Sequence, residues 1–164
     1  MTRYHPTVIL MADDDEDDVF LTQKALQKGD FLNTLYSVKN GEELVDYLLH
    51  RGQYTDRAQY PHPDIILLDL NMPCKDGREA LRDIKSHTEL QAIPIIVFTT
   101  SRMEEDVHYT YTLGVNSFIT KPTTFETLTE VMQTINKYWF KIVSLPNGKK
   151  PSTHGDSPNE NSAH

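Results

Sequence analysis

The chain has 164 residues and a formal net charge of -8, a size that suits one domain with a proper core. Its acidity, with no Lys/Arg cluster beyond Lys149 and Lys150, argues against direct binding to nucleic acid. A single cysteine, Cys74, excludes an intramolecular disulfide and fits a reducing compartment, and no apolar run approaches the ~20 residues that cross a bilayer, so we expect a cytoplasmic protein without membrane contact.

The first apolar segment ends in a run of acids. Residues 7–12 are apolar and partly β-branched, which predicts a buried strand, and the six acids Asp13 to Asp18 follow at once. Blocks of like charge are more often solvated faces or tails than sites. We interpret Asp15 to Asp18 as the solvated first turn of a helix, where the helix dipole favours acids, and keep Asp13 and Asp14 as candidates for a metal site.

Four further apolar runs alternate with segments of helical spacing. The runs lie near residues 32–38, 64–69, 93–98 and 115–119. The helices after them are expected to start at capping-type pairs, namely Asn40 with Glu43, Asp76 with Glu79, Ser101 with Glu104, and Thr123 with Glu126. Residues 50–62 form a longer connection rich in Arg, Gln, Tyr and Pro, which predicts a surface insertion with freedom to move.

This alternation predicts an α/β fold, a doubly wound five-stranded parallel sheet with right-handed crossovers and helices on both faces. We expect one domain over residues 1–145 and, because residues 146–164 have almost nothing to bury, a disordered tail. Ligands of such sheets bind at the carboxyl ends of the strands. The polar side chains that fall there are Asp13, Asp14, Asp69, Thr99 and Lys121.

Four motifs, in this order, carry a resemblance to a known family. They are VILMADDDEDD at the first strand, DIILLDLNMPCKDG around the third, IPIIVFTTS at the fourth and GVNSFITKP at the fifth. Over roughly residues 7–144 the chain resembles the receiver domain of two-component response regulators. The resemblance implies a flavodoxin-like receiver fold with the strand order 2-1-3-4-5.

The resemblance also implies a phospho-acceptor and a metal site. Asp69 corresponds to the acceptor. Mg²⁺ would be bound by Asp14 directly, by Asp13 largely through water, by Asp69 and by the backbone carbonyl of Asn71. The chemistry is sound, because a carboxylate forms an aspartyl phosphate when the phosphoryl group is oriented and its charge is neutralised, and Mg²⁺ prefers a few carboxylates plus phosphate oxygens.

Three more positions have roles that the resemblance implies. Thr99 corresponds to the hydroxyl that binds a phosphoryl oxygen, and Lys121 to the ammonium that pairs with the phosphate. Phe118 occupies the rotating aromatic position, so Thr99 and Phe118 together form the expected switch. The Lys121-Pro122 bond is expected to be cis, because the family uses a cis bond there to aim the lysine.

The function implied is signalling rather than enzymatic turnover. A stand-alone receiver would take a phosphoryl group from a sensor histidine kinase and change the surface of its fourth helix, fifth strand and fifth helix, for partner binding or onward phosphotransfer. The insertion, the ILLDLNMP form and the aromatic ending before Leu145 resemble most the regulators paired with phytochrome-type kinases.

The last helix carries more apolar side chains than one face can bury. A core-facing stripe is expected from Leu128, Val131, Ile135 and Ile142, which leaves Tyr138, Trp139, Phe140 and Val143 in excess. We therefore expect a homodimer through the far end of this helix, with Trp139 or Phe140 at its centre. The alternative is that Trp139 closes the core of its own monomer.

Three other functions stay open. A receiver-like interaction module would bind partners without phosphorylation. A Mg²⁺-dependent phosphatase with an Asp nucleophile would need an acid two residues after Asp69, where this chain has Asn71. A flavodoxin-like cofactor binder would need a phosphate loop after the first strand, where the acid run repels phosphate.

Overall fold

Five parallel strands form one sheet at the centre of the protein, in the order β2-β1-β3-β4-β5. The structure is a computed structural model, and it describes residues 6–29 and 32–148. The strands are β1 (Thr7–Ala12), β2 (Asn33–Val38), β3 (Ile65–Leu68), β4 (Ile95–Thr99) and β5 (Ser117–Thr120). The predicted fold class and strand order are therefore confirmed.

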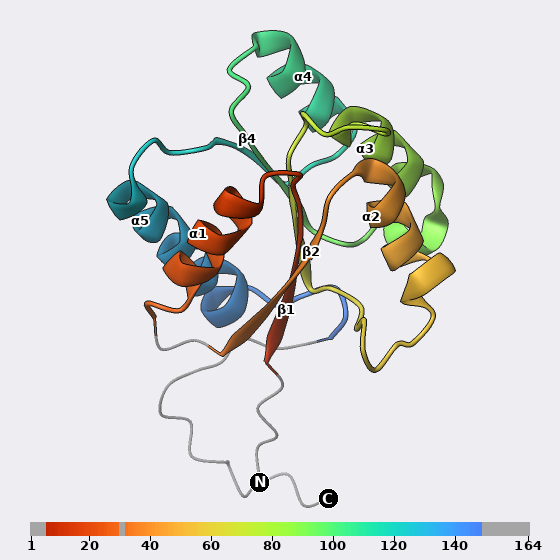
Figure 1. The fold of residues 1–164 in the computed structure, drawn as a ribbon, viewed down its shortest axis with the longest axis horizontal. Helices are drawn as coiled ribbons and strands as arrows, with labels where there is room; N and C mark the ends of the chain where they lie inside the picture. The colour runs from red at the N-terminus through yellow and green to blue at the C-terminus, as the bar shows by residue number, and fades with distance from the viewer. Residues whose placement is uncertain (1–5, 30–31, 149–164) are drawn as a thin grey trace, which may run out of the picture.

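Helices cover both faces of the sheet, with α1 and α5 on one side and α2 and α3 on the other (Figure 1). The helices are α1 (Glu16–Leu26), α2 (Gly41–Leu48), α3 (Gly77–Ser86), α4 (Glu104–Thr112) and α5 (Phe125–Asn136). Short 3₁₀ turns, η1 (Gly52–Tyr54) and η2 (Thr88–Leu90), follow α2 and α3, and a π-helical segment, η3 (Lys137–Ile142), continues α5. No helix in the described part of the chain is long and apolar enough to cross a membrane.

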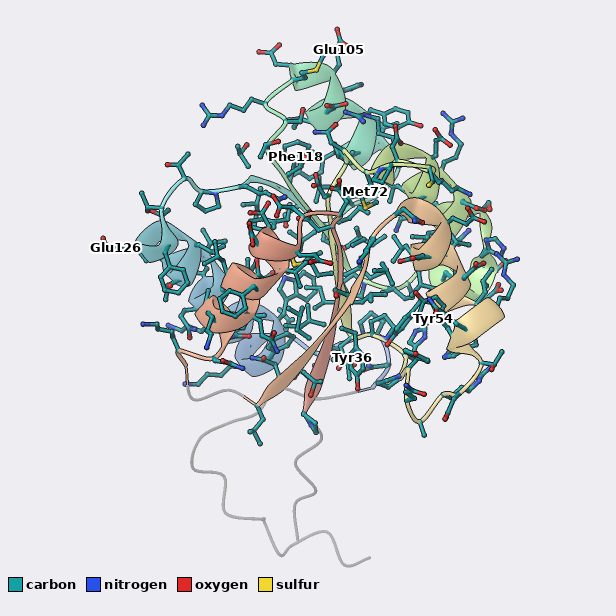
Figure 2. The ribbon with its side chains drawn as sticks, in the orientation of Figure 1. Tyr36, Tyr54, Met72, Glu105, Phe118 and Glu126 are labelled. Carbon is teal, nitrogen blue, oxygen red and sulfur yellow. The ribbon has the colours of Figure 1, made fainter. Side chains whose placement is uncertain are left out.

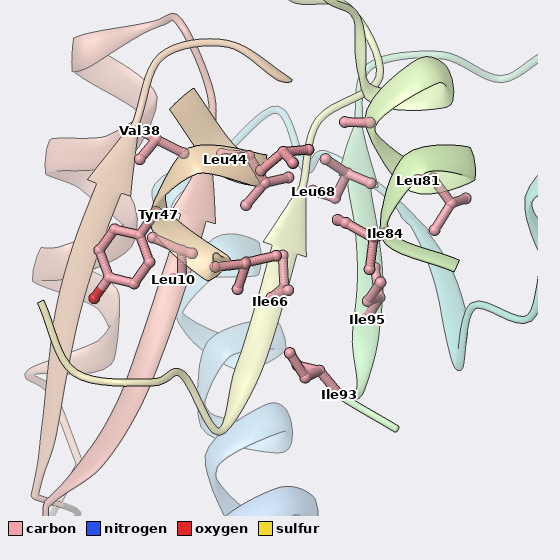
Figure 3. Packing of buried hydrophobic residues seen from close by; sticks show 14 of the residues in the cluster. Leu10, Val38, Leu44, Tyr47, Ile66, Leu68, Leu81, Ile84, Ile93 and Ile95 are labelled. Atoms are coloured by element: carbon pink, nitrogen blue, oxygen red, sulfur yellow. The ribbon is translucent and has the colours of Figure 1, made fainter. Parts of the chain in front are cut away.

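Alternate residues of the central strands divide between two apolar cores. Leu10 and Ile66 face the core under α2 and α3 (Figure 3), whereas Ile9 and Leu67 face the core under α1 and α5. Burying each such side chain contributes about 1.5–3 kcal/mol. Because both faces are covered, β3 and β4 are apolar along their whole length, and their polar residues come only where the strands end.

Two of the predicted helix starts are confirmed. The side chain of Asn40 accepts a hydrogen bond from the backbone N–H of Glu43 and caps α2. The side chain of Asp76 accepts from the backbone N–H of Glu79 and caps α3. In both cases a short polar side chain satisfies an amide that the first helical turn leaves unpaired.

The other two predicted starts were wrong. Ser101 does not cap α4, because its hydroxyl donates to Asp106 at 2.6 Å and the residue at the cap position is Met103. The cap of α5 is Thr124 rather than Thr123, and its hydroxyl accepts from the N–H one turn ahead. Short hydroxyl side chains can bond several nearby groups, so a capping pattern in the sequence does not by itself decide which residue caps the helix.

The segment predicted as a surface insertion lies mostly at the surface, and its tyrosines attach it to the core. Tyr54 of η1 is buried, and its ring centroid lies 5.3 Å from that of Tyr47 and 4.9 Å from that of Tyr60. The Tyr47 hydroxyl donates to the carbonyl of Pro61 at 2.8 Å. The tyrosines of the insertion thus anchor it to α2. The predicted surface location of residues 50–62 is confirmed for most of them, and their freedom to move stays a prediction.

The π-helical segment changes which side chains of the C-terminal helix face the core. Ile142 is 55% exposed, although the predicted stripe put it in the core, whereas Phe140 is 6% exposed and Trp139 packs against the core under α1 and α5. A π turn adds a residue to the helical repeat, which shifts every later side chain around the axis. The expectation of Phe140 at the centre of a dimer was therefore wrong.

Only the start of the predicted tail can be described. Within residues 146–148, the side chain of Asn147 donates a hydrogen bond to the buried carboxylate of Asp64. The remaining tail residues, 149–164, lie outside the described residues. The expected tail over 146–164 therefore stays a proposal.

Candidate functional site

Three carboxylates meet at the carboxyl edge of the sheet. Asp13 and Asp14 follow β1, Asp69 follows the neighbouring β3, and one oxygen of each lies within 4.8 Å of the other two. Asp13 and Asp69 are buried, whereas Asp14 is exposed. An open group of hard oxygen ligands fits Mg²⁺, which keeps several waters and takes few protein ligands. The structure thus brings together the three side chains predicted for the metal site.

Backbone hydrogen bonds orient the two buried carboxylates. Asp13 Oδ1 accepts from the N–H of Asp15 at 2.9 Å, and Asp69 Oδ1 accepts from the N–H of Asn71 at 3.2 Å. The second bond joins the Asp69 side chain to the backbone two residues on, in the manner of an Asx turn, and Asn71 is exposed. The Oδ2 atoms of both carboxylates accept hydrogen bonds from the same lysine, Lys121.

Gly77 allows α3 to start directly against the end of β3. Its N–H donates to the carbonyl of Leu70 at 3.0 Å. A Cβ at Gly77 would lie 2.2 Å from the carbonyl oxygen of Asp69 and 2.8 Å from Leu70 Cα, closer than real Cβ atoms approach. Only glycine permits this approach, so Gly77 lets the first turn of α3 pack directly against the backbone of Asp69.

Lys121, which follows β5, binds three carboxylates at once. Its Nζ lies 2.6 Å from Asp13 Oδ2, 2.7 Å from Asp18 Oδ2 and 3.2 Å from Asp69 Oδ2, and 8% of its side chain is exposed. The interpretation of Asp18 as part of a merely solvated turn was wrong. The sequence signal that could have identified Asp18 as a pocket residue was its position in the first turn of a helix that starts where β1 ends.

The pocket changes the proton affinity of two of its members. Burial raises the pKa of Asp13 to about 6, although hydrogen bonds from Lys121 and from the Asp15 N–H act in the opposite direction. Burial alone would lower the pKa of Lys121, but its hydrogen bonds to Asp13 and Asp18 raise that pKa above the ordinary value overall. Lys121 is therefore charged throughout the neutral range, and Asp13 takes up a proton near pH 6 when no cation is bound.

A chain of polar contacts connects the end of β4 with α3 and α4. Thr99 is fully buried, and its Oγ1 accepts from the N–H of Ser101 at 3.4 Å. The Ser101 hydroxyl donates to Asp106 on α4, which also binds Arg78 of α3 through two hydrogen bonds of 2.7 Å. The guanidinium holds the pKa of Asp106 below its usual range.

Helix α4 has few apolar anchors. Among residues 104–112, all of which are described, the buried side chains are Asp106 and Thr110. The predicted switch residue Phe118 lies on β5 beside α4 (Figure 2), is partly buried against the core under α2 and α3, and donates its backbone N–H to the Tyr111 hydroxyl at 3.1 Å. An element held mainly by polar contacts is a good candidate for movement.

The predicted cis peptide before Pro122 was wrong. The described residues contain no cis peptide bond, so the Lys121-Pro122 bond is trans. The trans form of an X-Pro bond is favoured by about 0.5–1 kcal/mol. Since the trans backbone already brings Lys121 Nζ to Asp13, Asp18 and Asp69, directing the lysine into the pocket does not require the cis form.

Comparisons with known proteins find a family model and several relatives that this chain matches. Residues 9–133 match the family model described as the response regulator receiver domain. The chain is 38% identical over 141 residues to the response regulator Rcp1 of Synechocystis sp., with 86% of this chain and 94% of that protein covered. It is 35% identical to the probable methanogenesis regulatory protein FilR2 of Methanothrix harundinacea, with 82% and 84% covered.

Two solved structures illustrate the likeness in three dimensions. The phosphorylated cyanobacterial phytochrome response regulator RcpA has a TM-score of 0.80 and 37% identity, covering 87% of this chain and 99% of that one. The Mn²⁺-bound form of Rcp1 has a TM-score of 0.78 and 38% identity, covering 86% and 99%. Both share the fold described above.

Proposed function

Because this chain belongs to the response regulator receiver family, we propose that it accepts a phosphoryl group from a sensor histidine kinase on Asp69. The observation that carries the proposal is the meeting of Asp69 with Asp13, Asp14 and Lys121 in one pocket at the carboxyl edge of the sheet. A carboxylate can attack phosphorus when the phosphoryl group is oriented and the surrounding charge is balanced.

We propose Mg²⁺ as the cation of this pocket. Asp14 would bind it directly, Asp13 largely through water, and Asp69 and the backbone carbonyl of Asn71 would complete the protein ligands. The closeness of the three carboxylates supports this proposal, and the Rcp1 relative has a structure in a Mn²⁺-bound form. The bound cation would neutralise charge on the phosphoryl oxygens.

The residues of the chain then have separate tasks. An Asp69 oxygen forms the new bond to phosphorus while the phosphorus–nitrogen bond of the donor histidine breaks and the imidazole leaves with its electron pair. Lys121, already 3.2 Å from Asp69 Oδ2, pairs with a phosphoryl oxygen, and the Thr99 hydroxyl donates to another. An Asp-nucleophile phosphatase would need an acidic side chain two residues after Asp69, and the residue there is Asn71. This speaks against phosphatase activity.

Phosphorylation would be read out on the face formed by α4, β5 and α5. The aspartyl phosphate brings about -1.5 to -2 charges into the pocket, which draws Thr99 inward and leaves space for Phe118 to turn. The polar anchoring of α4 through Asp106 supports this proposal, because such contacts can be exchanged without opening an apolar core. The output would be a changed partner contact or onward phosphotransfer.

The donor kinase is proposed to be of the phytochrome type. RcpA and the bacteriophytochrome response regulators AtBRR and RtBRR are 37%, 36% and 31% identical to this chain. The match to Rcp1 covers nearly the whole of that protein, which supports a stand-alone receiver. We further propose that the chain folds as one domain over residues 1–145 and acts in the cytoplasm. In this proposal it is a signalling protein that turns over no substrate of its own.

Labelling with a small phosphodonor tests the function. Acetyl phosphate with Mg²⁺ is expected to add one phosphoryl group to the wild type, which borohydride reduction and peptide mass spectrometry should place at Asp69. Asp69→Asn should remove the label completely, because the nucleophilic carboxylate is gone. Asp56→Asn, an exposed carboxylate before β3, should label like the wild type. Unlabelled wild type would instead support the phosphorylation-independent module.

A homodimer through the end of α5 remains part of the proposal, on a changed set of side chains. With Phe140 buried, the exposed apolar surface there consists of Tyr138 and Ile142. We expect the wild type to sediment as a dimer at about 50 μM, and Tyr138→Ser with Ile142→Ser to sediment as a monomer. Phe20→Ser, an equally exposed aromatic on α1, should leave the dimer intact. A monomeric wild type with and without phosphodonor would exclude the dimer.

A further inference from the structure

Asp18 belongs to the pocket through Lys121. An ammonium group has three N–H donors, and those of Lys121 have three carboxylate acceptors, Asp13, Asp18 and Asp69. The bond to Asp18 measures 2.7 Å and is shorter than the 3.2 Å bond to Asp69. Because the lysine side chain is almost fully buried, water does not readily replace a lost partner. The direction of the ammonium therefore depends on these acceptors.

Of the three acceptors, Asp18 alone lies outside the carboxylate cluster. Among the described residues, the group whose oxygens lie within 4.8 Å of one another contains Asp13, Asp14 and Asp69. A divalent cation there attracts the oxygens of Asp13 and Asp69 and repels the ammonium. Phosphorylation would also make one Asp69 oxygen the bridge to phosphorus, so Asp69 would no longer offer Lys121 a charged carboxylate. Asp18 is then the partner that Lys121 keeps.

Local structure holds Asp18 in place for this task. Its residue lies in the first turn of α1, which starts at Glu16. The cap residue Asp15 accepts from the N–H groups of Asp17 at 2.9 Å and Asp18 at 3.3 Å through one oxygen, Oδ1. This turn therefore has a defined position at the end of β1, beside the residue that follows β5.

We propose that Asp18 is a positioning residue for phosphoryl transfer, which keeps the Lys121 ammonium directed into the pocket while the cation and the phosphoryl group engage Asp13 and Asp69. The inference rests on the proposed function. A lysine side chain has large rotamer freedom, and a partner that persists through the reaction restricts that freedom before transfer begins.

The first test compares Asp18→Asn with Asp17→Asn in the full chain. Both variants remove one negative charge from the first turn of α1, but only Asp18 binds Lys121. With acetyl phosphate and saturating Mg²⁺, labelling of Asp69 is expected to be about tenfold slower in Asp18→Asn and within about twofold of wild type in Asp17→Asn. Asp18→Glu should recover part of the rate. Equal rates in the two Asn variants, or faster labelling in Asp18→Asn, would overturn the inference.

The second test uses the metal-free protein and needs no reaction. In ¹⁵N-labelled protein with EDTA, the Nζ protons of Lys121 should exchange with water about tenfold faster in Asp18→Asn than in wild type or Asp17→Asn. Unchanged exchange would show that Asp18 does not hold the ammonium. In a Lys121→Met background, Asp18→Asn should slow labelling no further than Asp17→Asn does. If Asp18 had a purely structural role, Asp18→Asn would slow labelling further even without the lysine.

The outcomes separate this inference from the proposed function. If wild type takes up no label at Asp69, the proposed function fails, and the exchange measurement still decides whether Asp18 holds Lys121. If wild type is labelled and the two Asn variants behave alike in either measurement, the role of Asp18 alone is wrong.

Discussion

The Asp14→Asn variant is expected to bind Mg²⁺ at least about 100-fold more weakly than the wild type, and to lose Mg²⁺-dependent labelling of Asp69 to a similar degree. Loss of a residue that merely supports a metal ligand typically costs 10–100-fold in affinity, so loss of a charged direct ligand should reach or exceed the upper value. Asp14 is suited to that part because it is exposed, and its carboxylate lies within 4.8 Å of those of Asp13 and Asp69.

Isothermal titration of the metal-free proteins with Mg²⁺ measures this loss directly. Asp17→Asn is the matched control. It removes the same charge from the first turn of α1, but Asp17 lies outside the carboxylate cluster. The free energy of unfolding of metal-free Asp14→Asn should stay within about 0.5 kcal/mol of wild type, as for other exposed substitutions. Wild-type Mg²⁺ affinity in Asp14→Asn would remove Asp14 from the metal site.

The second large effect concerns pH and Asp13. In the metal-free protein, Asp13→Asn is expected to gain stability relative to wild type as the pH rises, by about 2 kcal/mol between pH 4 and pH 7. The pKa of Asp13 is raised from 3.8 to about 6 in the folded protein. Between these values the folded state holds more protons than the unfolded chain, so the wild type loses stability as pH rises and the variant, which has no proton to lose, does not.

Urea unfolding of both proteins at several pH values, in EDTA, measures this difference. Lys121 contributes a constant amount over the range, because its pKa is raised and it stays charged. Loss of the Asp13 contact to Lys121 adds an offset that does not vary with pH, so the slope carries the prediction. A difference that is flat between pH 4 and pH 7 would show that Asp13 ionises as an ordinary surface carboxylate.

The sheet and the carboxylate cluster could be predicted from the sequence because they depend on local patterns and on one rule of topology. Continuous apolar runs such as 65–68 and 95–99 identify strands that are covered on both faces. Parallel strands end at the same edge, and the resemblance to the receiver family implied that β1 and β3 are neighbours, which brings Asp13, Asp14 and Asp69 together. The caps Asn40 and Asp76 are likewise local.

Packing between distant segments decided the rest. The contact of Asp18 with Lys121 joins residues 103 positions apart, and it depends on how α1 and the end of β5 are placed over the pocket. The burial of Phe140 and the exposure of Ile142 follow from a π turn, whereas a regular helical period places Ile142 in the core. Periodicity describes one segment at a time, and these features arise from the free energy of fitting several segments together.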